Sequence, residues 1–333
     1  MTILSDYFVT WLPRIECEMR LIVNLGTQPL ALNSMLRYHL GFANADGSPS
    51  RVASGKRIRP VMLLMACEAC GGNADVALPA AAAVELLHNF SLIHDDIEDG
   101  DTMRRGRPTL WSIHGVPQGI NTGDAMFAQA HMALQQLQVP AAHTLAALRT
   151  FDAMCLHLTV GQHLDISFES RTDVTADDYM QMIAGKTAAL TQACCEIGAI
   201  VAGADGSTIA ALAAFGRGLG MAFQLQDDVL GIWGDPAKTG KPQHDLARRK
   251  KTLPVLFAAD QDPELRASYF GSAALDEPAL KERITALGGR AHAEQLAAIL
   301  FGSAIQALEQ AGLQKPGCRL LADLAGSLIG RAA

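Results

Sequence analysis

The chain has 333 residues, of which 49% are hydrophobic and 18% are charged, and its formal net charge is −7. This composition can build a large core, and the negative charge argues against nucleic acid as a partner. The apolar runs, such as 77–87 and 197–204, are much shorter than a membrane span requires. The first residues, MTILSDYFVTWLPRIE, lack a signal-peptide layout. We therefore expect a cytoplasmic protein without a membrane span.

Helices are the expected secondary structure throughout. Alanine is abundant and segments with alternating Val, Ile and Thr are scarce, so the sequence predicts an all-α chain. In the first part of the chain, we expect one or two helices within 1–43, one from about Pro60 to the Gly71-Gly72 break, and one at 77–99. The polar segment 44–55 and the Arg-, Gly- and Pro-rich segment 101–120 are expected to be loops.

The remainder of the chain continues in the same pattern. Helices are expected at about 121–138, 142–170, 176–203, 207–233, 252–260, 277–288, 290–312 and 316–331. The segment 234–251 interrupts them with proline and glycine. No segment is long or low-complexity enough to divide the chain, so we expect one domain over residues 1–333.

Two acidic clusters lie in apolar helical sequence. The first is Asp95-Asp96-Ile97-Glu98-Asp99, and the second is Asp227-Asp228. Carboxylates at i, i+1 and i+4 lie within one helical turn, where they repel each other unless a cation binds. A single such cluster is more often a solvated acidic face. Two clusters, each surrounded by apolar residues and followed by basic residues, favour a functional site.

The basic residues gather beside the breaks between helices. They are Lys56, Arg57 and Arg59; Arg104, Arg105 and Arg107; and Lys238, Lys241, Arg248, Arg249, Lys250 and Lys251. Arginine binds phosphate through forked hydrogen bonds, and lysine acts as a point charge. Because carboxylates repel phosphates, a site with both needs a bridging cation, for which Mg²⁺ is suited. The sequence therefore indicates a site for diphosphate substrates.

The ordered set of motifs resembles the trans-isoprenyl diphosphate synthases, which form the polyprenyl synthetase family. Between about Gly55 and Pro254 the motifs follow in the family's order: GKRIRP, HDDIEDGDTMRRGRPT, GQHLD, GKTAAL, FQLQDDVLGIWGD, TGK and KKTLP. The resemblance implies a single large helical bundle around a central cavity, a homodimer, and isopentenyl and allylic diphosphates as substrates.

The resemblance also implies roles for individual residues. Three Mg²⁺ ions would be held by carboxylates on two helices: Asp95, Asp96 and Asp99 on one side, and Asp227, supported by Asp228, on the other. The allylic diphosphate would be contacted by Arg104, Lys186 and Lys241, with Lys250 as a further candidate. Isopentenyl diphosphate would be bound by Lys56, Arg59, His88 and Arg105. Thr187 and Gln224 would stabilise the developing positive charge, and Gln162 and Asp165 would line the same cavity.

The implied reaction needs no protein nucleophile. Metal ions and cations draw charge onto the leaving diphosphate, and the C–O bond ionises to an allylic cation. The double bond of isopentenyl diphosphate then attacks, and a proton is lost. One departure from the family pattern is Gly231, which stands where the second acidic motif usually has its third Asp. Asp235 lies one further turn along the chain. We expect retained activity, because Asp227 is the expected main ligand, and leave open the effect on metal affinity.

Product length is expected to depend on the residues before the first acidic cluster. Leu87, Phe90 and Ser91 lie eight, five and four positions before Asp95. Phe90 would lie about 7–8 Å back along the helix and could form the floor of the cavity, although a plain core phenylalanine would look the same. The resemblance favours the C20 product, geranylgeranyl diphosphate, with farnesyl diphosphate (C15) or a longer product as alternatives. A class I terpene cyclase and a non-catalytic partner subunit are the more distant alternatives.

Overall fold

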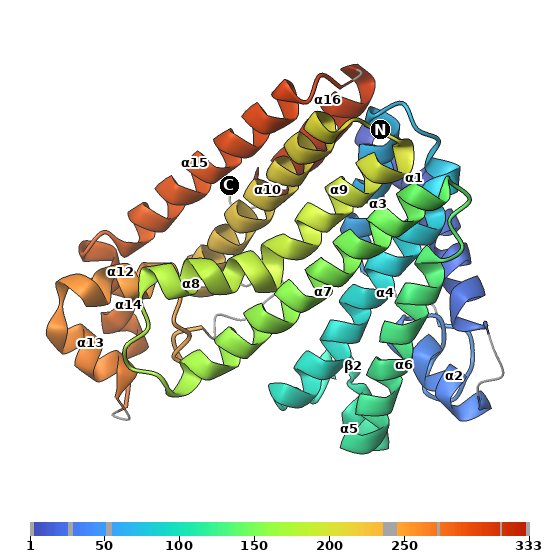
Figure 1. Cartoon of the computed structure of the whole chain (residues 1–333). Helices are drawn as coiled ribbons and strands as arrows, with labels where there is room; N and C mark the ends of the chain where they lie inside the picture. Colours follow the sequence, from blue (N-terminus) through green and yellow to red (C-terminus); the bar gives the residue numbers. More distant parts are fainter. Residues whose placement is uncertain are drawn as a thin grey trace. The chain divides into compact units, whose positions relative to one another are not determined.

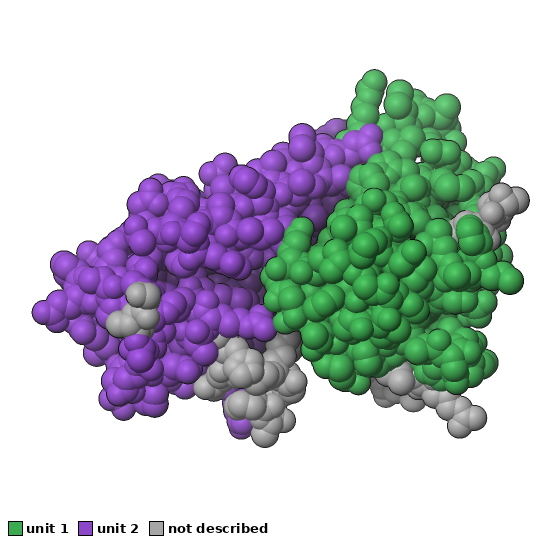
Figure 2. All heavy atoms as spheres, turned by 90° about the horizontal axis from the view of Figure 1, so that it is seen from below, with its two compact units in different colours: residues 1–149, 197–204 green, residues 150–196, 205–333 purple. Residues whose placement is uncertain are grey.

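The computed structural model describes residues 3–25, 29–50, 55–235, 245–271, 274–313 and 315–330. Across these residues the regular secondary structure is helical, apart from one two-stranded hairpin and one isolated bridge between Ala43 and Pro49, and turns and loops join the helices. The all-α prediction is therefore confirmed. The chain divides into two compact units, Met1–Arg149 with Ile197–Ala204, and Thr150–Glu196 with Asp205–Ala333, which we call unit 1 and unit 2 (Figure 2).

Unit 1 is built around the helix α4 (Figure 1). Its elements are α1 (Ile3–Val23), α2 (Leu30–His39), α3 (Ile58–Ala69), α4 (Ala74–Glu98), β1 (Met103–Arg104), β2 (Arg107–Pro108), α5 (Leu110–His114) and α6 (Val116–Leu134), with parts of α7 (Ala141–Ser170) and α9 (Ala189–Ala202). The helices α1, α3 and α6 pack on α4, and α6 lies beside it in Figure 1. Small side chains at Ala80–Ala83 are fully buried and permit this close packing.

The ends of α4 are fixed by local interactions. The side chain of Asn73 accepts a hydrogen bond from the backbone N–H of Asp75 and caps the first turn. At the other end, the helix ends at Glu98 with Asp99 as its C-cap, and Gly100 follows with a φ of +66°. The first acidic cluster therefore occupies the C-terminal turn of a helix whose body is core.

Unit 2 is organised along the helix α10. Its elements are α8 (Ala176–Ile183), the π-helical turn η1 (Ala184–Ala188), α10 (Gly206–Trp233), α12 (Leu253–Gln261), α13 (Pro263–Phe270), α14 (Glu277–Ala286), α15 (Gly289–Gln310) and α16 (Lys315–Ile329), with the other parts of α7 and α9. The helices α10 and α15 pack along each other, and η1, α12 and α16 also contact α10. A core that includes Met221, Leu225 and Val229 fixes the inner face of α10.

Both α4 and α10 are long and apolar enough to cross a membrane by length and composition alone. In their most apolar windows, 67% and 44% of the residues respectively are buried inside the protein. Core helices of soluble proteins pass the same test.

The predicted loop at 101–120 is wrong for most of its length. A two-residue turn, Arg105-Gly106, joins β1 to β2, and both residues have positive φ, +52° and +75°. This is the geometry that suits the twist of a hairpin. Helix α6 begins at Val116, because Pro117 suits the first helical turn. Helix α13 was also missed; Asp262 caps it by accepting from Glu264 N–H and Leu265 N–H.

Candidate active site

Of the three aspartates in the first acidic cluster, two lie on one face of α4 and the third is buried. Asp95 is half-buried and Asp99 is exposed, and they lie one helical turn apart on α4. Asp96 is only 2% exposed and accepts a hydrogen bond from Arg104 Nε at 2.5 Å. Burial raises the pKa of Asp96, and Arg104 opposes that shift. The structure therefore distinguishes Asp95 and Asp99, which lie on one face at the end of α4, from Asp96, which is buried and paired to Arg104.

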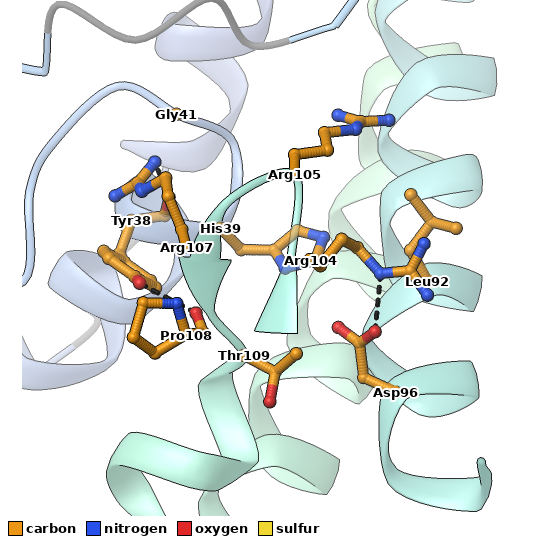
Figure 3. A pocket seen from close by; sticks show the side chains of 10 residues that line it. All are labelled: Tyr38, His39, Gly41, Leu92, Asp96, Arg104, Arg105, Arg107, Pro108 and Thr109. Carbon is orange, nitrogen blue, oxygen red and sulfur yellow. Dashed lines mark hydrogen bonds and ion pairs between the residues drawn. The ribbon is translucent and has the colours of Figure 1, made fainter. Parts of the chain in front are cut away.

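The hairpin that carries Arg104 closes a small cavity of about 50 Å³ next to this cluster. Figure 3 shows Arg104 pointing to Asp96, while Arg107 lies beside Tyr38. His39 also lines the cavity. Its pKa is lowered to about 3 by burial and by the surrounding arginines, so it is neutral at physiological pH. His39 has no motif around it, and the sequence did not identify it.

A second, larger pocket in unit 1 gathers the cations expected to bind isopentenyl diphosphate. It has a volume of about 320 Å³ and is lined by Gly55, Lys56, Arg57, Ile58, Arg59, Glu85, His88 and Arg105. Arg59 Nη1 lies 3.2 Å from His88 Nε2. Burial and the nearby arginines hold the pKa of His88 well below its usual value, so the neutral ring accepts from Arg59. Four predicted residues, Lys56, Arg59, His88 and Arg105, thus meet in one pocket.

Gly55 and Arg57, which also line this pocket, contribute to its structure. A side chain at Gly55, whose φ is +100°, would meet the Arg105 guanidinium, so glycine leaves the space for it. Arg57 turns inward, where Nη1 donates to Glu85 Oε1 at 2.7 Å and Nη2 donates to the Leu40 carbonyl at 2.9 Å. Both Arg57 and Glu85 are buried. Arg57 is therefore committed to the fold, whereas Lys56 is exposed to the pocket mouth.

The residues expected to set product length occupy three different environments. Leu87 is fully buried in the core. Ser91 is half-buried and donates its hydroxyl to the His88 carbonyl at 2.8 Å. The ring of Phe90 packs against Phe127 of α6, with ring centroids 5.0 Å apart. Phe90 therefore contributes to the contact between α4 and α6.

In unit 2, the π-helical turn η1 carries Lys186 and Thr187 of the GKTAAL motif. A Cβ on Gly161 would overlap the backbone at Lys186, and a Cβ on Gly185 would overlap the backbone of α7. These glycines therefore permit η1 to contact α7 directly. Lys186 Nζ lies 2.5 Å from Asp165 Oδ2 on α7, so the two predicted residues form an ion pair. Gln162 is half-buried on the same helix.

Thr187, the next residue of the same turn, begins a hydrogen-bond chain. Thr187 Oγ1 donates to Gln224 Oε1 at 2.7 Å, and Gln224 Nε2 donates to Asp228 Oδ1 at 2.8 Å. The hydroxyl of Tyr179 donates to Asp228 Oδ2. Burial raises the pKa of Asp228 to about 7, against the effect of these hydrogen bonds. The structure thus brings together Thr187 and Gln224 as expected and adds Tyr179, which lies seven residues before Lys186 and had no motif of its own.

The second acidic cluster is divided between two environments. Asp227 is half-buried, whereas Asp228 is 6% exposed and paired as described. Lys250 is exposed and its ammonium lies 3.4 Å from Asp245 Oδ1. Lys241 lies outside the described residues.

The residues present fit magnesium held jointly with a substrate. Within the described ranges, no group of three or more His, Cys, Asp and Glu side chains could hold a metal ion unaided. Magnesium is usually bound by one or two carboxylates together with substrate phosphates. The pair Asp95 and Asp99, beside the cations of the hairpin, matches that requirement.

Known proteins with similar sequences belong to the family that the motifs resemble. The sequence model described as polyprenyl synthetase matches residues 49–286. The geranylgeranyl diphosphate synthase of Mycobacterium tuberculosis is 48% identical over 293 residues, which are 85% of this chain and 83% of the relative. A (2E,6E)-farnesyl diphosphate synthase of Mycobacterium bovis is 48% identical over 227 residues, which are 68% of this chain and 63% of the relative.

Solved structures share the fold over nearly the whole chain. The polyprenyl synthetase of Streptomyces coelicolor has a TM-score of 0.89 and 34% identity and covers 98% of this chain and 99% of that chain. The polyprenyl synthase of Caulobacter crescentus, complexed with calcium and isoprenyl diphosphate, has a TM-score of 0.81 and 30% identity and covers 98% of both chains. These likenesses confirm the resemblance drawn from the motifs.

Proposed function

Because the chain belongs to the polyprenyl synthetase family of prenyltransferases, we propose that it condenses isopentenyl diphosphate head-to-tail with allylic diphosphates. We further propose that the reaction depends on three Mg²⁺ ions and that the main product is geranylgeranyl diphosphate. One arrangement in unit 1 carries this proposal. The carboxylates of Asp95 and Asp99 lie at the end of α4, and the pocket of Lys56, Arg59, His88 and Arg105 provides a second place for a diphosphate.

The side chains divide the work of the reaction as follows. Lys56, Arg59 and Arg105 bind the diphosphate of isopentenyl diphosphate, and neutral His88 orients Arg59. Magnesium, when bound at the carboxylates, supplies positive charge for the leaving diphosphate. Arg104, Lys186, Lys241 and Lys250 add cationic groups for the allylic diphosphate.

The carbon chemistry is assigned to the hydrogen-bonded pair in unit 2. Gln224 donates to Asp228, so its amide oxygen is fixed toward Thr187. These oxygens are suited to stabilise the positive charge of the allylic cation, because oxygen dipoles held in place cost no reorganisation when charge develops. Gln162 and Asp165 line the same region of α7, and Asp165 holds Lys186.

The C20 product is supported by two observations. The relative from Mycobacterium tuberculosis carries the name geranylgeranyl diphosphate synthase. The Phe90 ring packs against Phe127, and we take this pair as the floor that stops a chain growing along α4. Farnesyl diphosphate is the alternative, because a similarly identical relative is named for that product.

Three properties of the whole protein belong to this proposal. We assign both units to one functional domain, because the family match runs from residue 49 to 286 and so includes residues of each. We also assign a homodimer without nucleic-acid partners, and a cytoplasmic location without a membrane span.

A product assay tests the proposed function against its competitors. The protein is incubated with Mg²⁺, isopentenyl diphosphate, and dimethylallyl, geranyl or farnesyl diphosphate, and the chain length of the product is measured. A prenyltransferase consumes isopentenyl diphosphate and yields longer diphosphates. A class I terpene cyclase would release diphosphate and hydrocarbon from the allylic substrate alone, and a non-catalytic subunit would yield nothing. The pocket around Arg59 and Arg105 favours the first outcome.

A further inference from the structure

Gly231 has an unexpected neighbour in unit 2. It lies four residues after Asp227 on α10 and therefore on the same helical face. A Cβ built on Gly231 would overlap the carboxylate of Asp245, with Oδ2 as the nearest atom. The space that a third aspartate of the second motif would need is thus filled by a carboxylate from another segment.

The same aspartate holds Lys250 in two ways. Asp245 Oδ1 lies 3.4 Å from Lys250 Nζ, and the Asp245 carbonyl accepts from Lys250 N–H at 3.0 Å. One carboxylate oxygen therefore faces the lysine, and the other lies over Gly231. A side chain at position 231 would displace Asp245 and, with it, the partner of Lys250.

The segment from Asp245 to Lys250 is fixed to the body of unit 2. Leu246 is buried in the core that also contains Ile232 of α10. Tyr269 donates its hydroxyl to the Lys250 carbonyl at 2.9 Å, and Arg249 Nη1 donates to the Tyr269 carbonyl at 2.6 Å. Because the backbone is held at these points, the place of Asp245 over Gly231 determines where the Lys250 ammonium lies.

The charges around Lys250 belong to the candidate site. Desolvation lowers the pKa of Lys250, but the carboxylates of Asp245, Asp228 and Asp165 outweigh it and raise the pKa above the usual value. Asp165 is the residue that pairs with Lys186. Lys250 is therefore a charged group within electrostatic reach of the residues assigned to the allylic diphosphate.

We propose that the absence of a side chain at Gly231 leaves the space that the Asp245 carboxylate occupies. We propose further that Asp245, held in this position, positions Lys250 to bind the substrate diphosphate. On this proposal, glycine is required at position 231 to accommodate Asp245, and its presence is not simply the loss of a metal ligand. Asp245 acts through Lys250 and is a positioning residue. The inference rests on the proposed function in one respect only, the identity of the diphosphate.

A binding cycle tests the link between Gly231 and Lys250. The affinity for inorganic diphosphate with Mg²⁺ is measured by calorimetry for the wild type, Gly231→Ala, Lys250→Met and the double variant. We expect each single variant to bind roughly 5–10-fold more weakly, since each loses one charge-assisted contact. The double variant should bind no more weakly than Lys250→Met. Additive effects, or unchanged affinity in Gly231→Ala, would overturn the inference.

A matched glycine controls for the effect of alanine on helices. Gly302 lies in α15 with nothing within 4 Å of an added Cβ. Gly302→Ala should keep wild-type affinity and raise the melting temperature, because alanine is the better helix former. Gly231→Ala should fail to raise the melting temperature of the wild type. It should raise the melting temperature of the Asp245→Ala variant, in which the overlap is absent. An equal rise in both backgrounds would show that Asp245 does not occupy the space beside Gly231.

The product assay separates this inference from the proposed function. A wild type that binds diphosphate but makes no prenyl product would overturn the proposed function and leave the binding cycle valid. A wild type that binds no diphosphate would overturn both.

Discussion

Tyr179 donates its hydroxyl to the buried carboxylate of Asp228, from a position 49 residues earlier in the chain. Because Gln224 occupies the other carboxylate oxygen, Asp228 is satisfied by protein groups alone. The two members of the second acidic cluster therefore lie in different environments. Asp227 is half-buried, whereas Asp228 is buried and holds the amide of Gln224.

Replacing Tyr179 by Phe tests this division. The variant leaves a buried carboxylate with one donor fewer, which should cost about 1–3 kcal/mol of stability. It should also lower kcat roughly 10-fold or more, because the Gln224 amide is no longer held in position, while KM for both substrates changes little. Steady-state kinetics and thermal unfolding measure the two effects separately.

Tyr7→Phe is the matched control for that experiment. Tyr7 donates to Glu68 at 2.7 Å in unit 1, so its loss removes the same kind of hydrogen bond at a place without assigned chemistry. We expect a lower melting temperature with unchanged kcat. If both variants lose kcat in proportion to stability, Tyr179 has no positioning role.

The carboxylates of the first acidic cluster should also differ in their effect on activity. Asp95→Asn should reduce kcat by roughly 100-fold or more, because the charge that balances the cation is lost. A chelator should abolish the activity of the wild type while its circular dichroism spectrum stays the same, since the core packs without metal. Glu98→Gln, an exposed carboxylate on the same turn, serves as control and should stay within about twofold of wild type. Retained kcat in Asp95→Asn would remove it from the metal site.

Phe90 should limit product length in both directions. Phe90→Ala opens the space between α4 and Phe127 of α6, so the product should lengthen by at least one C5 unit. Phe90→Trp fills more of that space and should shift the product toward C15. Chromatography of the dephosphorylated products measures both variants, and an unchanged chain length in each would mean that another residue forms the floor.

The sequence predicted those features that depend on local pattern. The long helices follow from apolar periodicity. The motifs named Thr187 and Gln224, which the structure joins by a hydrogen bond, and Lys186, which pairs with Asp165. The hairpin was missed because Arg105, a residue with a side chain, adopts a positive φ that favours glycine. The contacts of Asp228 with Tyr179 and of Asp245 with Gly231 depend on how segments distant in the sequence pack together. The spacing of residues in the sequence does not predict such contacts.

Lys56 and Arg57 are adjacent in the chain and should fail in different ways when replaced by alanine. Arg57 is buried with Glu85, so Arg57→Ala removes the ion-pair partner of a buried carboxylate that otherwise accepts from Asn89, and it should cost about 3–5 kcal/mol of stability. Lys56 is exposed at the mouth of its pocket, so Lys56→Ala should leave the melting temperature nearly unchanged. In the Lys56→Ala variant, the KM for isopentenyl diphosphate should rise roughly 10-fold because one phosphate contact is lost. The KM for the allylic substrate should stay the same. Equal effects of the two variants on stability would contradict the division between a fold arginine and a substrate lysine.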